Sequence, residues 1–126
     1  MGVVSSVQEA FKRFLSRGKP GWVERPMISV AEGIALIHNA GGKASTAHPG
    51  LYGLDSEIKG FKESGLDGIE VLHSDHKPSD VRRYTKLCAE LDLAPTGGSD
   101  DHGAGAGKGN IGEIRAPLEW LEALRP

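Results

Sequence analysis

The stretch GLDGIEVLH, residues 65–73, decides the fold that this sequence predicts. It follows a helical pattern, and its β-branched residues Ile69 and Val71 stand among apolar neighbours. β-Branched residues in a short apolar run between turn signals are typical of a buried strand. We therefore expect residues 67–73 to form a strand with structure on both sides of it in the chain.

The flanking segments repeat this pattern in both directions. Short apolar runs that end in turn residues predict two further strands, at 43–48 and 93–97. Helical spacing of apolar residues predicts helices at 54–64, 78–91 and 117–124. Strands that alternate with helices at this spacing are joined by right-handed crossovers and lie parallel in one sheet. The predicted fold class is α/β, with parallel strands and flanking helices.

The N-terminal part of the chain is expected to be organised differently. Capping-box patterns at 6–9 and 29–32 predict the starts of two helices. Between these helices, the segment 20–27 contains two prolines and is expected to be an extended linker. We expect one domain, in which residues 1–28 form a helical insertion and linker and residues 29–126 form the βα units.

Composition limits the possible partners of the chain. A net charge of −2 over 126 residues gives no electrostatic reason to expect binding to nucleic acid or a membrane. No apolar run is long enough to span a bilayer. The single cysteine, Cys88, excludes an internal disulfide, and its place on an apolar helix face predicts a core residue. These features favour a cytoplasmic protein.

Each of the three predicted strands is followed by a potential metal ligand. His48 follows the first strand, His73 ends the second, and Asp100 and His102 follow the third. Parallel α/β sheets and barrels place their sites at the carboxyl ends of their strands. We therefore expect these side chains to meet at one edge of the sheet.

The segment TGGSDDHG, residues 96–103, has two readings of equal weight. In extended backbone, Asp100 and His102 would point to the same face and offer a carboxylate and an imidazole to a metal. Alternatively, the segment is an Asx-type turn with an exposed histidine.

His48, which precedes Pro49, is expected to have extended backbone. Alone, it would more often be a hydrogen-bonded structural residue than a ligand, but a D-x-H pair on a neighbouring strand favours a shared site. Glu70, within an apolar strand, would either face the sheet interior and support the site or face solvent.

For His73 and His76 we favour a substrate contact or a structural role over metal ligation. Lys108 lies in a glycine-rich run without the G-K-[ST] ending of a phosphate-binding loop, yet as a mobile cation it could meet a phosphate. Ser99 does not stand in the G-x-S-x-G pattern of a nucleophilic serine.

Three motifs in this order resemble the C-terminal half of a PHP (polymerase and histidinol phosphatase) domain, with the closest likeness to TrpH-like metal-dependent phosphoesterases. The motifs are Ala47-His48-Pro49-Gly50, then 65–71, then 97–103. The segment 3–23 is similar to the helical insertion and return strand that precede the A-H-P motif in that family.

The resemblance implies a portion of a distorted (β/α)7 barrel with a multinuclear metal site at its strand ends. It implies that His48, Asp100 and His102 bind divalent metal ions, either Mn, Fe or Zn. The implied reaction is hydrolysis of a phosphoester in a small metabolite, a nucleotide or a short oligonucleotide, by a metal-activated water.

The sequence also departs from the pattern of that family. The family begins with a His-x-His motif, which these 126 residues do not contain, and Asp101 stands where an aromatic residue is common. We expect this chain alone to be catalytically incomplete, as a fragment, a truncated product or one half of a split enzyme. Its partner would be a complementary N-terminal half or a second copy. The alternative is a non-catalytic half-barrel that acts by associating with another chain.

Overall fold

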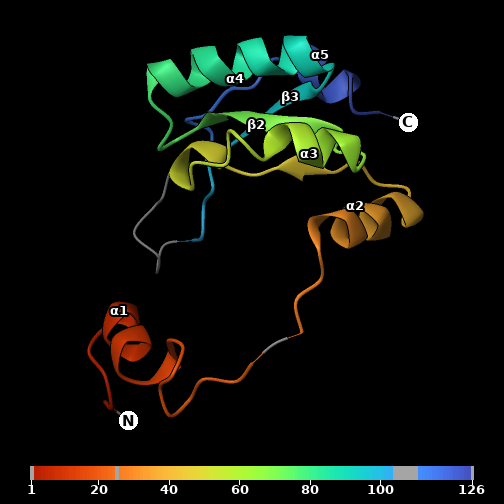
Figure 1. Ribbon diagram of the computed structural model, residues 1–126. Helices are drawn as coiled ribbons and strands as arrows, with labels where there is room; N and C mark the ends of the chain where they lie inside the picture. Colours follow the sequence, from red (N-terminus) through yellow and green to blue (C-terminus); the bar gives the residue numbers. More distant parts are fainter. Residues whose placement is uncertain (1, 25, 104–110, 126) are drawn as a thin grey trace.

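A computed structural model describes residues 2–24, 26–103 and 111–125 of the chain (Figure 1). Three short strands form one sheet, and helices precede, connect and follow them. In chain order the elements are α1 (Val7–Ala10), the π-helical turn η1 (Phe11–Leu15), α2 (Val30–Asn39), β1 (Ser45–Thr46), the 3-10 turn η2 (Pro49–Leu51), α3 (Ile58–Glu63), β2 (Gly68–His73), α4 (Pro78–Leu91), β3 (Ala94–Gly98) and α5 (Leu118–Glu122).

The sheet is parallel and its strand order, β1-β2-β3, follows the chain. Ser45 pairs with Gly68, which in turn pairs with Ala94, so the three strands begin in register. A bulge between Glu70 and Leu72 shifts the register before the end of β2. The α/β class with parallel strands and flanking helices is therefore confirmed. The three strands do not by themselves close a barrel.

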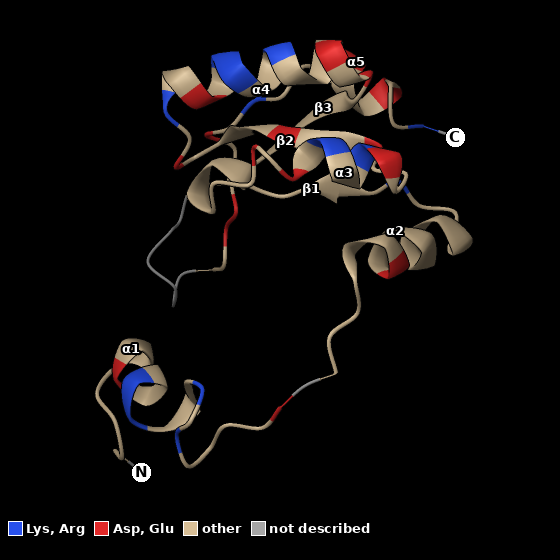
Figure 2. Cartoon of the chain, viewed as in Figure 1, with Lys and Arg blue, Asp and Glu red and all other residues tan. Residues whose placement is uncertain are grey.

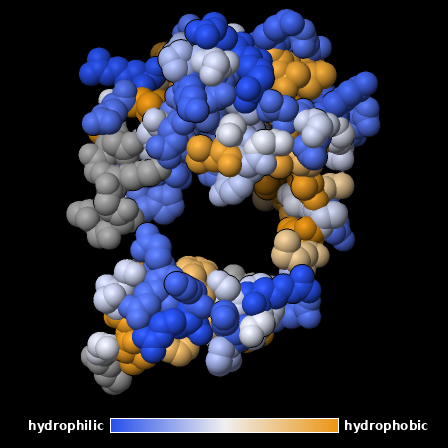
Figure 3. All heavy atoms as spheres, turned by 60° about the vertical axis from the view of Figure 1, so that its left-hand side comes forward, coloured by the Kyte–Doolittle hydropathy of each residue, from blue (hydrophilic) through white to orange (hydrophobic). Residues whose placement is uncertain are grey.

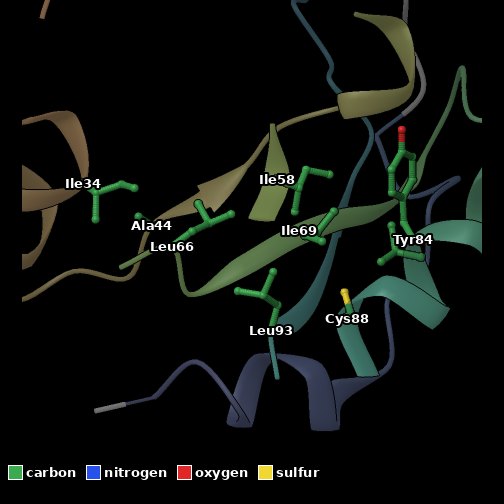
Figure 4. Close-up of a cluster of buried hydrophobic side chains, with 9 residues drawn as sticks. Ile34, Ala44, Ile58, Leu66, Ile69, Tyr84, Cys88 and Leu93 are labelled. Atoms are coloured by element: carbon green, nitrogen blue, oxygen red, sulfur yellow. The ribbon is translucent and has the colours of Figure 1, made fainter. Parts of the chain in front are cut away.

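The hydrophobic core lies between the sheet and its helices (Figure 4). Ile69 and Val71 of β2 are fully buried, and they pack with Ile58 of α3 and with Tyr84 and Cys88 of α4. Successive residues of a strand point to opposite faces, so Glu70 and Leu72 belong to the other face. These two residues are only half-buried, which shows that the helices cover one face of the sheet more fully than the other.

Helix α4 has the predicted bounds, residues 78–91, because Pro78 begins it and Asp92 ends it in left-handed backbone (φ 51°). Figure 2 shows bands of basic and acidic residues along this helix. Helix α2 begins at the predicted capping box, in which Ser29 and Glu32 each bond to the other's backbone N–H.

The first strand is shorter than predicted, at two residues instead of six. It cannot extend because the chain turns into left-handed backbone at His48 and continues as η2. The helix expected at 54–64 is likewise reduced to Ile58–Glu63, with turns before it.

The N-terminal helical segment lies apart from the sheet (Figure 1). Ser6 caps α1, as its sequence pattern predicts, by accepting the N–H of Glu9, but the carboxylate of Glu9 accepts from Ser5 instead of Ser6. No helix in the described part of the chain is long and apolar enough to cross a membrane.

Candidate functional site at the carboxyl edge of the sheet

The predicted site residues of all three strands gather at one edge of the sheet. His48 lies two residues beyond β1, His73 ends β2, and Asp100 lies two residues beyond β3. The ring centroids of His48 and His73 are 5.2 Å apart. Nε2 of His73 lies 3.6 Å from Oδ2 of Asp100. The parallel register brings these strand ends together, as the sequence indicated.

The backbone of His48 is left-handed (φ 30°, ψ 54°), so the prediction of extended backbone before Pro49 is wrong. Two contacts hold this conformation. The N–H of His48 donates to Oε2 of Glu70 at 2.7 Å, and the carbonyl of His48 accepts the N–H of Leu51 at 3.1 Å. Left-handed backbone in a non-glycine residue is strained, and such strain is concentrated at functional sites.

Glu70 therefore makes a contact at the end of β1, and its support of a metal site stays a prediction. Its carboxylate reaches from the centre of β2 to the end of β1 and fixes the main chain of His48. The signal in the sequence was an acidic residue inside an otherwise apolar strand.

The ring of His48 has an unused polar atom. Its Nδ1 is buried and has no hydrogen-bond partner among the residues that the structure describes. The ring also lies beside that of Tyr52, with 5.4 Å between the ring centroids. A buried nitrogen without a partner costs free energy, which a ligand could recover.

The loop 99–103 combines features of both predicted readings. Asp101 accepts the N–H of Gly103 at 2.7 Å, which is an Asx turn, and His102 is exposed. Asp100 has left-handed backbone (φ 52°), so the expectation that extended backbone aligns Asp100 with His102 is wrong. The two side chains nevertheless stay close, with 3.8 Å between Oδ1 of Asp100 and Nδ1 of His102.

The hydrogen bond of His102 leaves one ring nitrogen available. Its Nδ1 lies 2.6 Å from the carbonyl oxygen of Asp100, and because a carbonyl only accepts, Nδ1 carries the proton. Nε2 of the neutral ring then has a free lone pair. Histidines that bind metals commonly donate their other N–H to a backbone carbonyl in this way.

His73 and His76 use their rings differently from His102. His73 is almost fully buried, and its Nδ1 accepts the N–H of Asp75 at 3.1 Å. His76 donates from Nδ1 to the carbonyl of Val71 and accepts the N–H of Gly50 at Nε2, so both of its nitrogens hold the main chain. A substrate contact by His76 stays a prediction, and it would require one of these bonds to break.

The close approach of His76 explains the glycine in A-H-P-G. A Cβ at Gly50 would lie 3.1 Å from both Cδ2 and Nε2 of His76. The loop after β1 therefore packs against the loop after β2 through this pair, and the ring of His76 rests in turn on Tyr84 of α4.

The chemistry of these donors fits a divalent ion with intermediate softness. A carboxylate from Asp100 and imidazole nitrogens from His48 and His102 suit Zn, Mn or Fe. In the described part of the chain, however, no three His, Cys, Asp or Glu side chains are already grouped to hold a metal ion. Lys108, the predicted phosphate contact, lies outside the described residues.

Comparison with known proteins gives a consistent class of relatives, although no family model matches the chain. The chain is 34% identical to the 5'-3' exoribonuclease Rnm of Escherichia coli, over 98% of its own length and 40% of that protein. It is 32% identical to a 3',5'-nucleoside bisphosphate phosphatase of Chromobacterium violaceum, over 88% of its length and 41% of that protein. The chain is related to phosphoesterases.

Two solved structures have the same fold over most of the chain. One, described as a metal-dependent phosphoesterase from Bifidobacterium adolescentis, matches 93% of this chain with a TM-score of 0.73 and 31% identity. An amidohydrolase from Chromobacterium violaceum, solved with bound sulfate and no metal, matches 99% with a TM-score of 0.67 and 29% identity. The matched region is 43% and 44% of those chains, and the chain spans about 40% of the length of the two curated relatives described above.

Proposed function

We propose that this chain carries the closing part of the metal site of a PHP-type phosphoesterase. The observation that carries the proposal is the meeting of His48, His73 and Asp100 at one sheet edge, where two buried imidazole nitrogens have no hydrogen-bond partner in the described part of the chain. Such atoms at the carboxyl ends of parallel strands are typical of a ligand site. The likeness to phosphoesterases supports the same chemistry.

In this proposal His48, Asp100 and His102 hold the metal. His102 offers the lone pair of Nε2 because its Nδ1 is engaged with the carbonyl of Asp100. Glu70 keeps His48 at the site through the main-chain N–H. A bound divalent ion would supply an activated water and positive charge for the phosphoryl oxygens.

The proposed substrate is a nucleotide, a short oligonucleotide or another small phosphorylated metabolite. The relatives from E. coli and C. violaceum are named for action on RNA and on nucleoside bisphosphates, which supports the first two. The sulfate in the C. violaceum structure supports a site that accepts a tetrahedral oxyanion.

The metal content of the purified chain and its variants tests the proposal. We expect the purified chain, after incubation with Mn²⁺ or Zn²⁺ and desalting, to retain metal, and His48→Ala, Asp100→Ala and His102→Ala each to retain less. His38→Ala is the matched control, because His38 lies on α2 and pairs with Asp67 at the opposite end of β2. Equal metal content in all four variants would contradict the assignment.

A second proposal concerns the exposed apolar surface of residues 7–27, which we call the N-terminal apolar face. A hollow of about 620 Å³ on this segment is lined by five of its members, Phe11, Leu15, Trp22, Val23 and Met27. Apolar atoms are visible there in the lower part of Figure 3. Its large apolar side chains, with exposures from 42% at Leu15 to 91% at Met27, are Val7, Phe11, Leu15, Trp22, Val23 and Met27.

An exposed apolar patch of this kind marks a surface that another polypeptide covers. The longer relatives have an additional part of the fold that does not match this chain. We propose that this additional part covers the N-terminal apolar face and supplies the remaining metal ligands. These 126 residues would then be inactive alone. In the alternative function, the half-barrel would associate with another chain through the same face but would have no catalytic role.

A mixing experiment tests this idea. The chain is mixed with a second polypeptide, which is produced separately and corresponds to the region of E. coli Rnm outside the match. We expect a complex on size-exclusion chromatography and metal-dependent phosphatase activity that neither piece has alone. Phe11→Ser with Val23→Ser should weaken the complex without lowering metal content. If the lone chain has phosphatase activity, and Asp100→Ala abolishes that activity, the proposal that the chain is catalytically incomplete would be contradicted.

A further inference from the structure

We infer that His73 is a hydrogen-bond donor to a phosphoryl oxygen and does not bind the metal. The tautomer of its ring suits this role. The N–H of Asp75 donates to Nδ1 of His73 at 3.1 Å, so Nδ1 holds a lone pair and no proton. A neutral imidazole has one proton, which must then be on Nε2.

This tautomer excludes metal ligation through Nε2. A metal needs a lone pair on the nitrogen that it contacts, whereas Nε2 of His73 carries hydrogen while Nδ1 accepts. The opposite arrangement holds at His102, where Nδ1 donates to the carbonyl of Asp100 and leaves Nε2 free. The local main chain therefore prepares two histidines of one site for two different tasks.

The proton on Nε2 of His73 points into the site and has no acceptor in the described structure. The residue is 3% exposed, and its Nε2 is buried without a hydrogen-bond partner within residues 2–24, 26–103 and 111–125. Oδ2 of Asp100 lies 3.6 Å away, which is beyond hydrogen-bond distance. This buried donor lies beside the ring of His48 and the carboxylate of Asp100, so an acceptor for its proton would have to come from a ligand at this edge of the sheet.

A phosphoryl oxygen is the acceptor that the proposed function supplies, and the inference rests on that function for the identity of the ligand. A hydrogen bond to a charged oxygen is stronger than a neutral one, and here it would form in a site shielded from water. His73 would thus position the phosphoryl group and neutralise part of its charge, while His48, Asp100 and His102 would hold the metal ion.

The tautomer can be measured directly on the 126-residue chain. Two-bond ¹H–¹⁵N correlation spectra of the histidine rings should show His73 as the Nε2–H form in metal-free protein. Titration with inorganic phosphate should shift its ring resonances, while those of His38, which pairs with Asp67 at the opposite end of β2, stay constant. A Nδ1–H tautomer, or no response to phosphate, would overturn the inference.

Two variants separate donation from ligation. His73→Gln keeps an N–H donor near the position of Nε2, and His73→Leu removes it. We expect His73→Leu to weaken phosphate binding about tenfold to a hundredfold, and His73→Gln to weaken it less, with metal content unchanged in both. Loss of metal in both variants would show that His73 is a ligand and overturn the inference. Metal content that does not respond to Asp100→Ala would contradict the proposed function instead, since tautomer and phosphate response are measured without metal.

Discussion

At the scale of single residues, the site depends on main-chain positions that side chains from other elements fix. Glu70 accepts the N–H of His48, and Asp100 and His48 both have left-handed backbone. Ligands presented from such positions keep their direction only while these supports are present. Substitution of these supporting residues is therefore as informative as substitution of the proposed ligands.

Glu70→Ala should loosen His48 and weaken metal binding. We expect a roughly tenfold to hundredfold higher Kd for Mn²⁺ or Zn²⁺, because residues that orient a ligand have effects of this size. Calorimetric titration of the metal-free protein with either ion measures this Kd. Glu70→Gln is the control, since its amide oxygen can still accept the N–H of His48. Wild-type affinity in Glu70→Ala would show that His48 needs no support from β2.

Asp67 has an electrostatic role at the opposite end of β2. Burial raises the pKa of Asp67, but hydrogen bonds from His38, from the N–H of Ala44 and from Lys43 outweigh it and lower the pKa to about 2. A carboxylate whose pKa is lowered by folding stabilises the protein above its unfolded pKa, and this stabilisation is lost as the pH falls toward 2.

We therefore expect Asp67→Asn to reduce the free energy of unfolding by about 1–2 kcal/mol at pH 7. The difference from the wild type should shrink as the pH falls from about 4 to about 2. Urea unfolding at several pH values measures both. Asp92→Asn is the control, because asparagine also tolerates the left-handed backbone at that position. A difference that does not depend on pH would mean that the charge of Asp67 contributes nothing.

At the scale of elements, the packing of β2 against β3 leaves no room for a side chain at Gly68. A Cβ there would lie 2.7 Å from the carbonyl oxygen of Ala94 and 3.2 Å from Oγ of Ser45. Ser45 and Thr96 meet across this glycine, with 3.0 Å between their hydroxyl oxygens.

Gly68→Ala should consequently destabilise the protein by about 1–3 kcal/mol, because backbone must move to admit the methyl group. Thermal or urea unfolding checks this. Gly60→Ala provides the comparison, since Gly60 lies in α3 with nothing near its Cβ position, and alanine there should be neutral or stabilising. Equal effects of the two changes would show that the sheet adjusts freely around position 68.

The elements also show what the sequence could predict. Local signals set α4 and the start of α2, because a proline and a capping box act within a few residues. The short β1 and the left-handed His48 depend on Glu70, which is 22 residues away, so local pattern pointed to the wrong backbone. At Asp100 the contact is local: the segment had two predicted readings, and the turn closed by Asp101 replaced the extended D-x-H geometry. The meeting of the strand ends was predictable because it follows from parallel topology alone.

At the scale of the whole molecule, the core and the N-terminal segment are separable. Every residue of the core cluster lies between Ile34 and Trp120. Deletion of residues 1–28 should therefore leave the unfolding midpoint within a few degrees of the wild type. Circular dichroism during heating measures this, and a chain that no longer unfolds cooperatively would contradict it. Association through the N-terminal apolar face should be lost in the same variant.

The strand order β1-β2-β3 has a kinetic consequence. Each strand pairs with its neighbour in the chain, so the contacts that build the sheet close only short loops. Folding rates rise as the contacts of a native structure become more local. We expect refolding of this chain, followed by stopped-flow fluorescence, to proceed at the same rate with or without the complementary polypeptide. The sheet edge that carries His48, His73 and Asp100 would then be in place before any partner arrives, and assembly would add to a finished surface.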